Sequence, residues 1–225
     1  MISRKLLILS IVLISATSGF SLQGLAKTVS EIMQGLDPVY RVIDGRQYSG
    51  YYIWNQPFTF LPGFKLRGGF VSEEAIIDAY QSSEGRLVSN DCFIARDTLV
   101  LDHAQISGRA RILDRAKIMG GAKIADEVRV FGDAVITDQA FIGEQARISG
   151  MAVISGNARV YGNAKVFGQA KVYGHVSLYH WARIFGDTEL CGNVQVGGDV
   201  SLRRTYKCDS SRLWMGSDHI KFALF

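Results

Sequence analysis

The residues best suited to acid–base or metal chemistry in this 225-residue chain are four histidines: His103, His175, His180 and His219. Imidazole changes its charge near neutral pH and is a frequent zinc ligand, so convergent histidines could act as a general base or hold a metal. His175 and His180 are the closest pair and are the candidate catalytic residues. The nearest acid that follows them is Asp187, and the alternative is that both are ordinary surface histidines.

A second group of chemically suitable residues is basic and recurs every eighteen residues: Arg111, Arg129, Arg147, Lys165 and Arg183. Three phenylalanines follow members of this group two residues later: Phe131, Phe167 and Phe185. If the backbone returns to the same place every eighteen residues, these side chains form a column of cations beside a column of rings. Such a surface could bind an anionic polymer, with the rings against sugars. The alternative is a solvated face that stiffens the protein, neutralised by nearby acids such as Asp114, Asp133 and Asp187.

The element that must position both groups is a six-residue repeat between Cys92 and Arg204. An aliphatic residue falls at every sixth position from Ile94 to Leu202, nineteen times without an insertion. The residue two before it is small, and is Ala in twelve cases; the residue two after it is Gly in eleven cases and Asp or Glu in five. A helix repeats its apolar positions at three and four residues, so a period of six does not fit one.

Each hexad predicts one short strand and one corner. Side chains two apart share a face of a strand, so the small and the aliphatic residue both point inward. The Gly or Asp that follows tolerates the left-handed backbone of a sharp corner. Three hexads close a triangular coil, and nineteen hexads give about six coils stacked roughly 4.8 Å apart. The predicted fold is therefore mainly β, a parallel β-helix over residues 92–204.

The run from Gly156 to Val166, Gly-Asn-Ala-Arg-Val-Tyr-Gly-Asn-Ala-Lys-Val, resembles the bacterial hexapeptide-repeat proteins of the acyltransferase type. The resemblance covers about half of the chain. It implies a single-stranded left-handed β-helix, often assembled as a homotrimer. Faces bearing Val135 and Val153, or Tyr161 and Tyr179, are candidates for such a contact. The commonest family pattern places Gly or an acid directly after the aliphatic residue, whereas this chain places it two after, as in a branch with Gly-Asn-Ala runs.

The family resemblance also bears on activity. Hexapeptide-repeat acyltransferases generally use a histidine base, often with a loop between coils that shapes the acyl-donor site, and no loop interrupts the hexads here. The segment Gly174–His180 is similar to the zinc-binding Gly-His-x-x-x-x-His segment of the γ-class carbonic anhydrases. In that family the second histidine directly follows the aliphatic residue, whereas His180 comes two after Leu178, and the third histidine is missing. We therefore predict no metal site and no cofactor.

Residues 1–26 are predicted to be a cleavable signal peptide that sends the protein to the periplasm or outside the cell. Arg4 and Lys5 form its charged start, Leu6 to Ile14 form an apolar core too short to span a bilayer, and Ala26 precedes the preferred cleavage site. The alternatives are an uncleaved anchor and an ordinary buried helix. Removal of this segment lowers the formal charge from +4 to about +2, which argues against nucleic acid as a partner.

The chain has three cysteines, Cys92, Cys191 and Cys208. An oxidising compartment permits disulfides. Cys208 falls eighteen residues after Leu190 and so lies one coil further on, next to Cys191. A continued register would point Cys191 outward and Cys208 inward, and the pairing of the two stays open at this point. Cys92 occupies a small-residue interior position and is predicted to be a packing residue.

Residues 27–91 lack the repeat and are predicted to form a small mixed α/β cap on the first coil. The sequence predicts, in chain order, a helix over Val29–Gln34, a hairpin of Val39–Ile43 and Arg46–Trp54 turning at Asp44-Gly45, a loop over Gln56–Gly69 and a helix over Ser72–Gln81. The aromatic residues of this segment either cover the apolar end of the first coil or line a ligand-binding lobe: Tyr51, Tyr52, Trp54, Phe58, Phe60 and Phe64.

Residues 205–225 are predicted to form a short plug over the last coil. Taken together, the signal segment, the unbroken repeat and the scattered histidines predict an exported, non-catalytic β-helix. It would serve as a scaffold or as a binding module for an anionic envelope glycan or lipid. An acyltransferase-like enzyme is the alternative, and a metal enzyme similar to the γ-class carbonic anhydrases is a third hypothesis.

Overall fold

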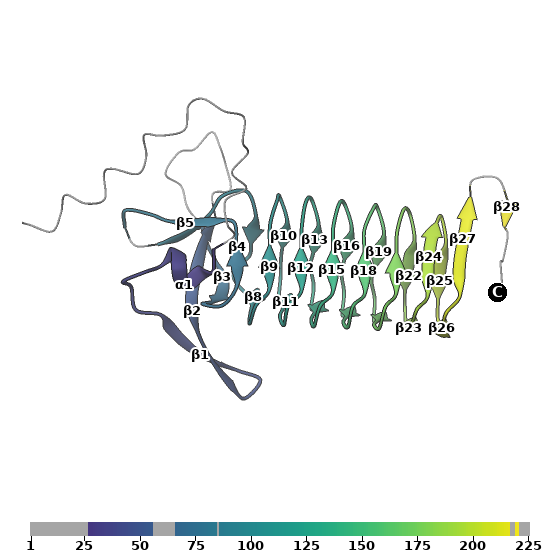
Figure 1. The fold of residues 1–225 in the computed structure, drawn as a ribbon, viewed down its shortest axis with the longest axis horizontal. Coiled ribbons are helices and arrows are strands. Elements are labelled where there is room, and N and C mark those ends of the chain that lie inside the picture. Colours follow the sequence, from purple (N-terminus) through teal and green to yellow (C-terminus); the bar gives the residue numbers. More distant parts are fainter. Residues whose placement is uncertain (1–26, 56–65, 85, 217–218, 221–225) are drawn as a thin grey trace, which may run out of the picture.

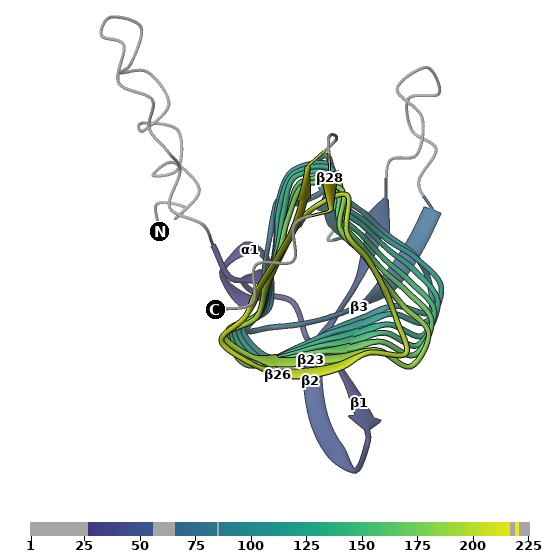
Figure 2. The same cartoon turned by 90° about the vertical axis from the view of Figure 1, so that its right-hand side faces the viewer.

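The structure is a computed structural model that describes residues 27–55, 66–84, 86–216 and 219–220. The described part is mainly β and forms a parallel β-solenoid whose turns follow one another along a rod (Figure 1). Viewed along the rod, the turns superpose into a triangle (Figure 2). This confirms the predicted fold class. The predicted signal segment, residues 1–26, and the aromatic residues Phe58, Phe60 and Phe64 lie outside the described residues.

Three sheets of mainly parallel strands form the sides of the triangle, and we call these sides the basic face, the cysteine face and the tyrosine face. The basic face consists of β7 (Phe93–Ile94), β10 (Arg111–Ile112), β13 (Arg129–Val130), β16 (Arg147–Ile148), β19 (Lys165–Val166), β22 (Arg183–Phe185) and β25 (Ser201–Arg203). The cysteine face consists of β8 (Leu99–Val100), β11 (Lys117–Ile118), β14 (Val135–Ile136), β17 (Val153–Ile154), β20 (Lys171–Val172), β23 (Glu189–Gly192) and β26 (Tyr206–Asp209). The tyrosine face consists of β4 (Ile76–Ile77), β9 (Gln105–Ile106), β12 (Lys123–Ile124), β15 (Phe141–Ile142), β18 (Arg159–Val160), β21 (Ser177–Leu178), β24 (Gln195–Gly198) and β27 (Arg212–Gly216).

The interior of the solenoid is the column of aliphatic residues that the repeat predicts. Every hexad aliphatic residue from Ile94 to Val196 is buried, and the small residue two before each is buried as well. Neighbouring turns are in register, so Ile112 lies opposite Val130. Burial of each aliphatic side chain stabilises the fold by about 1.5–3 kcal/mol, which makes this column the main source of stability.

The corners of the triangle depend on a left-handed backbone. The residue two after each hexad aliphatic residue has a positive φ angle from Asp102 through Arg204. Gly occupies most of these positions because it has no Cβ to clash. Where Asp stands there, its carboxylate accepts a hydrogen bond from the backbone N–H of the equivalent corner in the next turn, at 2.8 to 3.1 Å. This bond joins consecutive turns through Asp102, Asp114, Asp126 and Asp138.

The stack has about seven turns rather than six, because rungs outside the uninterrupted repeat extend it at both ends. At the N-terminal end, β3 (Leu66–Ser72) pairs with β8, and β4 pairs with β9. Val71 and Ile77 therefore continue the interior column, six residues apart, and each follows a small residue, Gly69 or Ala75, by two. The hairpin of β5 (Ala79–Gln81) and β6 (Leu87–Ser89) separates these two hexads from Ile94.

The predicted helix over Ser72–Gln81 is therefore wrong, and the predicted loop over Gln56–Gly69 ends earlier, because β3 begins at Leu66. Local signals favour a helix here. However, pairing β4 with the edge of β9 satisfies backbone groups and buries Ala75 and Ile77. Tertiary pairing outweighs a weak local propensity.

The hairpin of the cap is confirmed, and so is the first helix, although it ends at Ile32 rather than at Gln34. Helix α1 (Val29–Ile32) begins at a capping box in which Thr28 and Glu31 exchange hydrogen bonds. Strands β1 (Val39–Ile43) and β2 (Arg46–Asn55) are antiparallel and project beside the solenoid (Figure 2). At the hairpin turn, Asp44 forms a 2.7 Å ion pair with Lys117 of the cysteine face, and the neighbouring Ile43 is buried in a small cluster with Leu101 of the solenoid.

At the C-terminal end, β26 and β27 continue the parallel pairing past Arg204, with one residue fewer per turn. Ser201 lies opposite Arg183, eighteen residues away, but Tyr206 lies opposite Glu189, seventeen residues away. The corner between β25 and β26 is thus one residue short. The shift places Cys208 opposite Cys191, and the two form a disulfide with a Cα–Cα distance of 4.3 Å. The inward direction predicted for Cys208 is wrong because it assumed an unbroken register.

The same shift puts a lysine at the end of the aliphatic column. Lys207 lies opposite Leu190, and its side chain is only 18% exposed. Its Nζ is 3.0 Å from a carboxylate oxygen of Asp209. Hydrogen bonds from Ser211 and from Lys207 lower the pKa of Asp209 to about 2, so this carboxylate stays charged at neutral pH. β27 then pairs antiparallel with β28 (His219–Ile220).

The corner geometry predicts a specific order of stability for variants of Gly150. A Cβ on Gly150 would lie 2.8 Å from the carbonyl oxygen of Gly168, whereas one on Gly45 would meet nothing within 4 Å. Both glycines have a positive φ angle, so an alanine at either position introduces backbone strain of about 1–2 kcal/mol. Gly45→Ala should lower the free energy of unfolding by this strain alone, whereas Gly150→Ala should lower it further because its Cβ clashes with the next turn. Gly150→Asp should recover about 1 kcal/mol, because its carboxylate can accept from the N–H of Gly168. Urea and thermal unfolding measure this order, and Gly150→Asp less stable than Gly150→Ala would contradict the corner bond.

The cysteines predict a stepwise thiol count. Burial raises the pKa of Cys92 to about 12, so its thiol is neutral and enclosed at pH 8. With Cys191 and Cys208 in a disulfide, the folded protein should show no thiol reactive toward a colorimetric reagent. Denaturation should reveal one thiol, and denaturation with reductant should reveal three. Three thiols in denaturant alone would show that the disulfide is absent.

Candidate functional site

The predicted cations form a continuous column on the basic face. Parallel pairing places Arg111 opposite Arg129, Arg129 opposite Arg147, Arg147 opposite Lys165, and Lys165 opposite Arg183. Each is the outward-pointing residue before a buried aliphatic residue, so the two-residue period of the strand directs all five outward. Neighbouring strands are roughly 4.8 Å apart, so the column is about 19 Å long.

The charges of this column are largely uncompensated. In the part of the chain that the structure describes, Arg111, Arg129, Arg147 and Lys165 form no salt bridge, and Arg183 has a loose contact of 3.8 Å with Asp199. Neighbouring like charges at this spacing repel by about 1 kcal/mol per pair in water, less with salt. The stack therefore holds the cations together against their repulsion.

Two of the acids expected to neutralise the column have other partners. Asp133 forms a 2.8 Å ion pair with Arg115 at the corner of the basic face. Asp114 accepts the hydrogen bond from the N–H of Gly132 that joins two turns. Neither carboxylate forms an ion pair with a cation of the column.

The predicted phenylalanines lie beside the cations in an interrupted column. The rings of Phe167 and Phe185 are 5.0 Å apart and nearly parallel, at 5°, so each covers one face of the other. Phe131 is separated from them by a turn that carries Ser149 at this position, and it is 37% exposed. Phe131 is thus the ring best placed to contact a ligand held by Arg129 and Arg147.

The structure does not bring the two candidate catalytic histidines into a shared site. His175 lies at a corner, where its Nε2 is 3.5 Å from the side-chain nitrogen of Asn157 in the preceding turn. His180 occupies a left-handed corner position, with φ of 57°, and its ring is roughly perpendicular to that of Tyr179, at 5.1 Å between ring centres. Within the described ranges, neither imidazole is paired with a carboxylate, and no group of three metal-binding side chains occurs.

The other two faces carry the residues considered for self-association. On the tyrosine face, the rings of Tyr161 and Tyr179 are 5.7 Å apart and nearly parallel, and Tyr179 lies over the backbone of Gly197. On the cysteine face, Val135 lies opposite Val153. These residues are only partly exposed. Among the described residues, no helix has the length and apolarity needed to cross a membrane.

Comparison of the chain with protein-family models, with curated proteins and with solved structures finds no match. The architecture is therefore defined by the repeat and by the structure: a parallel β-solenoid of about seven turns that presents five stacked cations.

The uncompensated column predicts that removal of one cation stabilises the protein. Arg147→Gln relieves repulsion from Arg129 and Lys165, and should raise the free energy of unfolding by about 0.2–1 kcal/mol in low salt. The control Arg115→Gln removes a cation that is paired with Asp133, and should leave stability unchanged or lower it.

Chemical denaturation in about 20 mM and about 1 M salt measures both effects, and the gain should shrink at high salt because exposed charges are screened. A loss of stability in Arg147→Gln at both salt concentrations would instead mean that the stacked side-chain stems stiffen the rod.

Proposed function

We propose that this chain is an exported, non-catalytic β-helix of the hexapeptide-repeat type that acts as a binding scaffold. Its ligand is a linear anionic polysaccharide of the cell envelope, held along the basic face. The observation that carries this proposal is the column from Arg111 to Arg183, whose cations stack on consecutive turns and, among the described residues, meet a single carboxylate, that of Asp199 at 3.8 Å from Arg183.

The shape of the charge favours a linear polymer over a flat lipid surface. The column is one residue wide and runs along the rod, so a chain that lies parallel to the rod meets every cation. Neighbouring cations are about 4.8 Å apart, which is less than the Debye length of about 8 Å at physiological salt, so the fields of adjacent cations add along this line. A bilayer would also have to accommodate the corners on either side, one of which carries the ion pair of Arg115 with Asp133.

The chemistry of the column suits carboxylate, sulfate or phosphate groups. Guanidinium groups donate two parallel hydrogen bonds to such anions, and these charge-assisted bonds are stronger than neutral ones. Phe131 adds an apolar surface next to Arg129 for the ring of a sugar. Because the strands are locked in a packed solenoid, the cations are already arranged before the ligand arrives, which reduces the entropy lost on binding.

Export is the second half of the proposal. The disulfide between Cys191 and Cys208 supports it, because such bonds persist in oxidising compartments. The charged and apolar start of the chain supports it as well, although residues 1–26 lie outside the described part.

The test is a binding measurement with polygalacturonate as the anionic polymer, using the variant Arg129→Glu/Arg147→Glu. The control is Lys123→Glu/Arg159→Glu, which changes the net charge equally at exposed positions of the tyrosine face. We expect salt-sensitive binding by the wild type, a loss of about tenfold or more in the basic-face variant, and about twofold or less in the control. Vesicles of phosphatidylcholine with and without phosphatidylglycerol form a parallel arm.

Each outcome decides the proposal. No binding by the wild type, or an equal loss in both variants, would show that the column is not a specific site. Retention on anionic vesicles without polymer binding would replace the polysaccharide by a lipid surface.

A further inference from the structure

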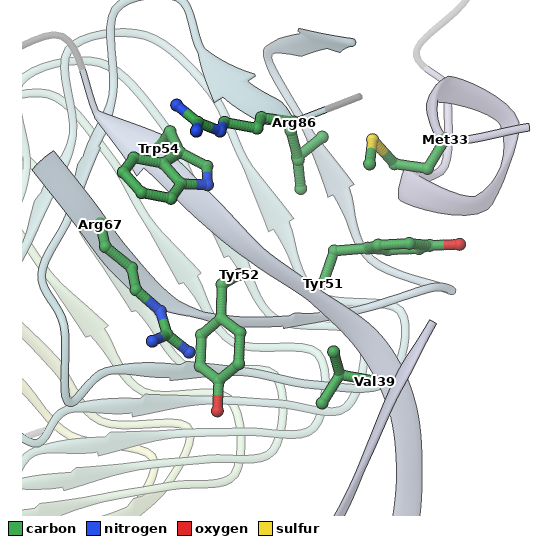
Figure 3. Close-up of a pocket in the computed structure, with 8 residues that line it drawn as sticks. Met33, Val39, Tyr51, Tyr52, Trp54, Arg67 and Arg86 are labelled. Carbon is green, nitrogen blue, oxygen red and sulfur yellow. The ribbon is translucent and has the colours of Figure 1, made fainter. Parts of the chain in front are cut away.

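The N-terminal cap contains a pocket that is separate from the basic face (Figure 3). Its volume is about 330 Å³. Its walls come from the end of α1, from β1, β2 and β3, and from the start of β6: Met33, Val39, Tyr51, Tyr52, Trp54, Arg67, Arg86 and Leu87. A pocket of this volume, at the lower end of the range for small-molecule sites, admits a small molecule rather than a polymer chain.

The side chains of strand β2 point alternately to the two sides of the strand and make different contacts on each side. Tyr51 and Ile53 are buried in the main core and cover the first turns of the solenoid. Tyr52 and Trp54 point to the other side of the strand and are only partly buried. A bulge between Tyr52 and Trp54 shifts the pairing with β3, so that Trp54 lies opposite Arg67. Tyr51 and Ile53 thus provide the capping contact, whereas Tyr52 packs edge to face with Phe70, at 5.9 Å between ring centres, and presents its remaining surface to the pocket.

One wall of the pocket is apolar and fixed. Met33 and Leu87 are buried. The hydroxyl group of Tyr51 donates a 2.8 Å hydrogen bond to the carbonyl oxygen of Leu36 and points away from the neighbouring pocket residues, as Figure 3 shows. The hydrogen bond of its hydroxyl group therefore holds the ring of Tyr51 in place. These three residues therefore form a closed floor, and the apolar surface left open to a ligand is that of Val39, Tyr52 and Trp54.

The other wall carries hydrogen-bond donors. The guanidinium of Arg67 lies 3.9 Å from the centre of the Tyr52 ring, and that of Arg86 lies 4.6 Å from the Trp54 ring. Arg86 is paired with Glu84 at 2.8 Å, whereas Arg67 forms no salt bridge with any residue that the structure describes. None of the described residues that line the pocket is acidic.

We propose that this pocket binds a small organic anion with a flat apolar body, such as an aromatic carboxylate. Stacking on Tyr52 occupies the face of the Arg67 guanidinium but leaves the N–H groups at its edge available, and these match the two oxygens of a carboxylate. The flat body of the ligand lies against the exposed side chain of Val39 and the partly exposed ring of Tyr52. The site is independent of the polymer-binding column, because it involves none of the cations of the basic face.

The experiment compares 2-naphthoate with its uncharged analogue 2-naphthamide by isothermal titration calorimetry on the full mature chain. We expect 2-naphthoate to bind and the amide to bind at least about tenfold more weakly, because the amide lacks the charge that Arg67 recognises. Arg67→Gln should weaken 2-naphthoate binding by about tenfold or more, and Arg67→Lys by less, since it keeps the charge but loses the paired N–H groups. The matched control Arg109→Gln removes an exposed cation of the solenoid and should bind like the wild type.

A second readout does not depend on affinity. The indole N–H resonance of Trp54, assigned with Trp54→Phe, should shift when 2-naphthoate is added, while those of Trp181 and Trp214 should not. Equal affinity for acid and amide, full affinity in Arg67→Gln, or no binding by the wild type would each overturn the proposal. Arg129→Glu/Arg147→Glu should retain 2-naphthoate binding, so the pocket and the basic face can fail separately.

Discussion

The close approach of backbones at the corners is the constraint on which the remainder of this structure depends. Two-residue strands can stack only if the chain changes direction sharply after each one, and the positive φ angles from Asp102 to Arg204 supply that change. A side chain at such a corner must avoid the turn above it, which restricts the position mostly to Gly. Asp is tolerated because its carboxylate accepts the hydrogen bond of the next corner. The six-residue pattern therefore reflects the positive φ angle needed at each corner at least as much as the need for a buried aliphatic residue in each strand.

A consequence of this constraint is that the surface is organised in columns. Since each turn repeats the last in register, any residue type that recurs every eighteen positions becomes a line of identical groups along the rod. The interior lines are apolar and stabilising, whereas the line of cations opposes stability. A rigid solenoid can carry such a line because its stability comes from the buried aliphatic column. The scaffold and the proposed binding surface are thus two products of one repeat.

The central turns could be predicted almost residue by residue from the sequence. The period alone predicts that Ile112 points inward and Arg129 outward, and which residues lie opposite them on adjoining turns. This is possible because every hexad has the same strand, corner and packing environment. The ends could not be predicted in this way. Ser72-Glu73-Glu74 has the local features of a helix start, and the partner that makes the following residues a strand, β9, lies about thirty positions further along the chain. The pattern of Gly69 with Val71 and Ala75 with Ile77 was a usable signal, concealed by the inserted hairpin before Ile94.

Two features of chemical interest depended on single-residue irregularities. The pairing of Cys191 with Cys208 required the loss of one residue at a corner, which no local motif marks. The pocket of the cap depends on a bulge in β2 and on Arg67 from a different strand, so the aromatic residues suggested a ligand-binding lobe without indicating its charge. The repeat predicts the regular turns, whereas the short corner before Cys208 and the bulge in β2 can be recognised only from the strand pairing in the structure.

The lysine at the end of the aliphatic column has a consequence for the length of the rod. A stack of identical rungs is in principle open-ended, because its last strands present unpaired backbone groups that could template another molecule and lead to fibres. An incoming rung would here have to dehydrate the ammonium group of Lys207 and its partner Asp209, and would meet a turn that is one residue out of phase. Desolvation of such an ion pair is costly. The missing residue at this corner and the antiparallel strand β28 on the edge of β27 therefore both oppose the stacking of a second molecule on this end.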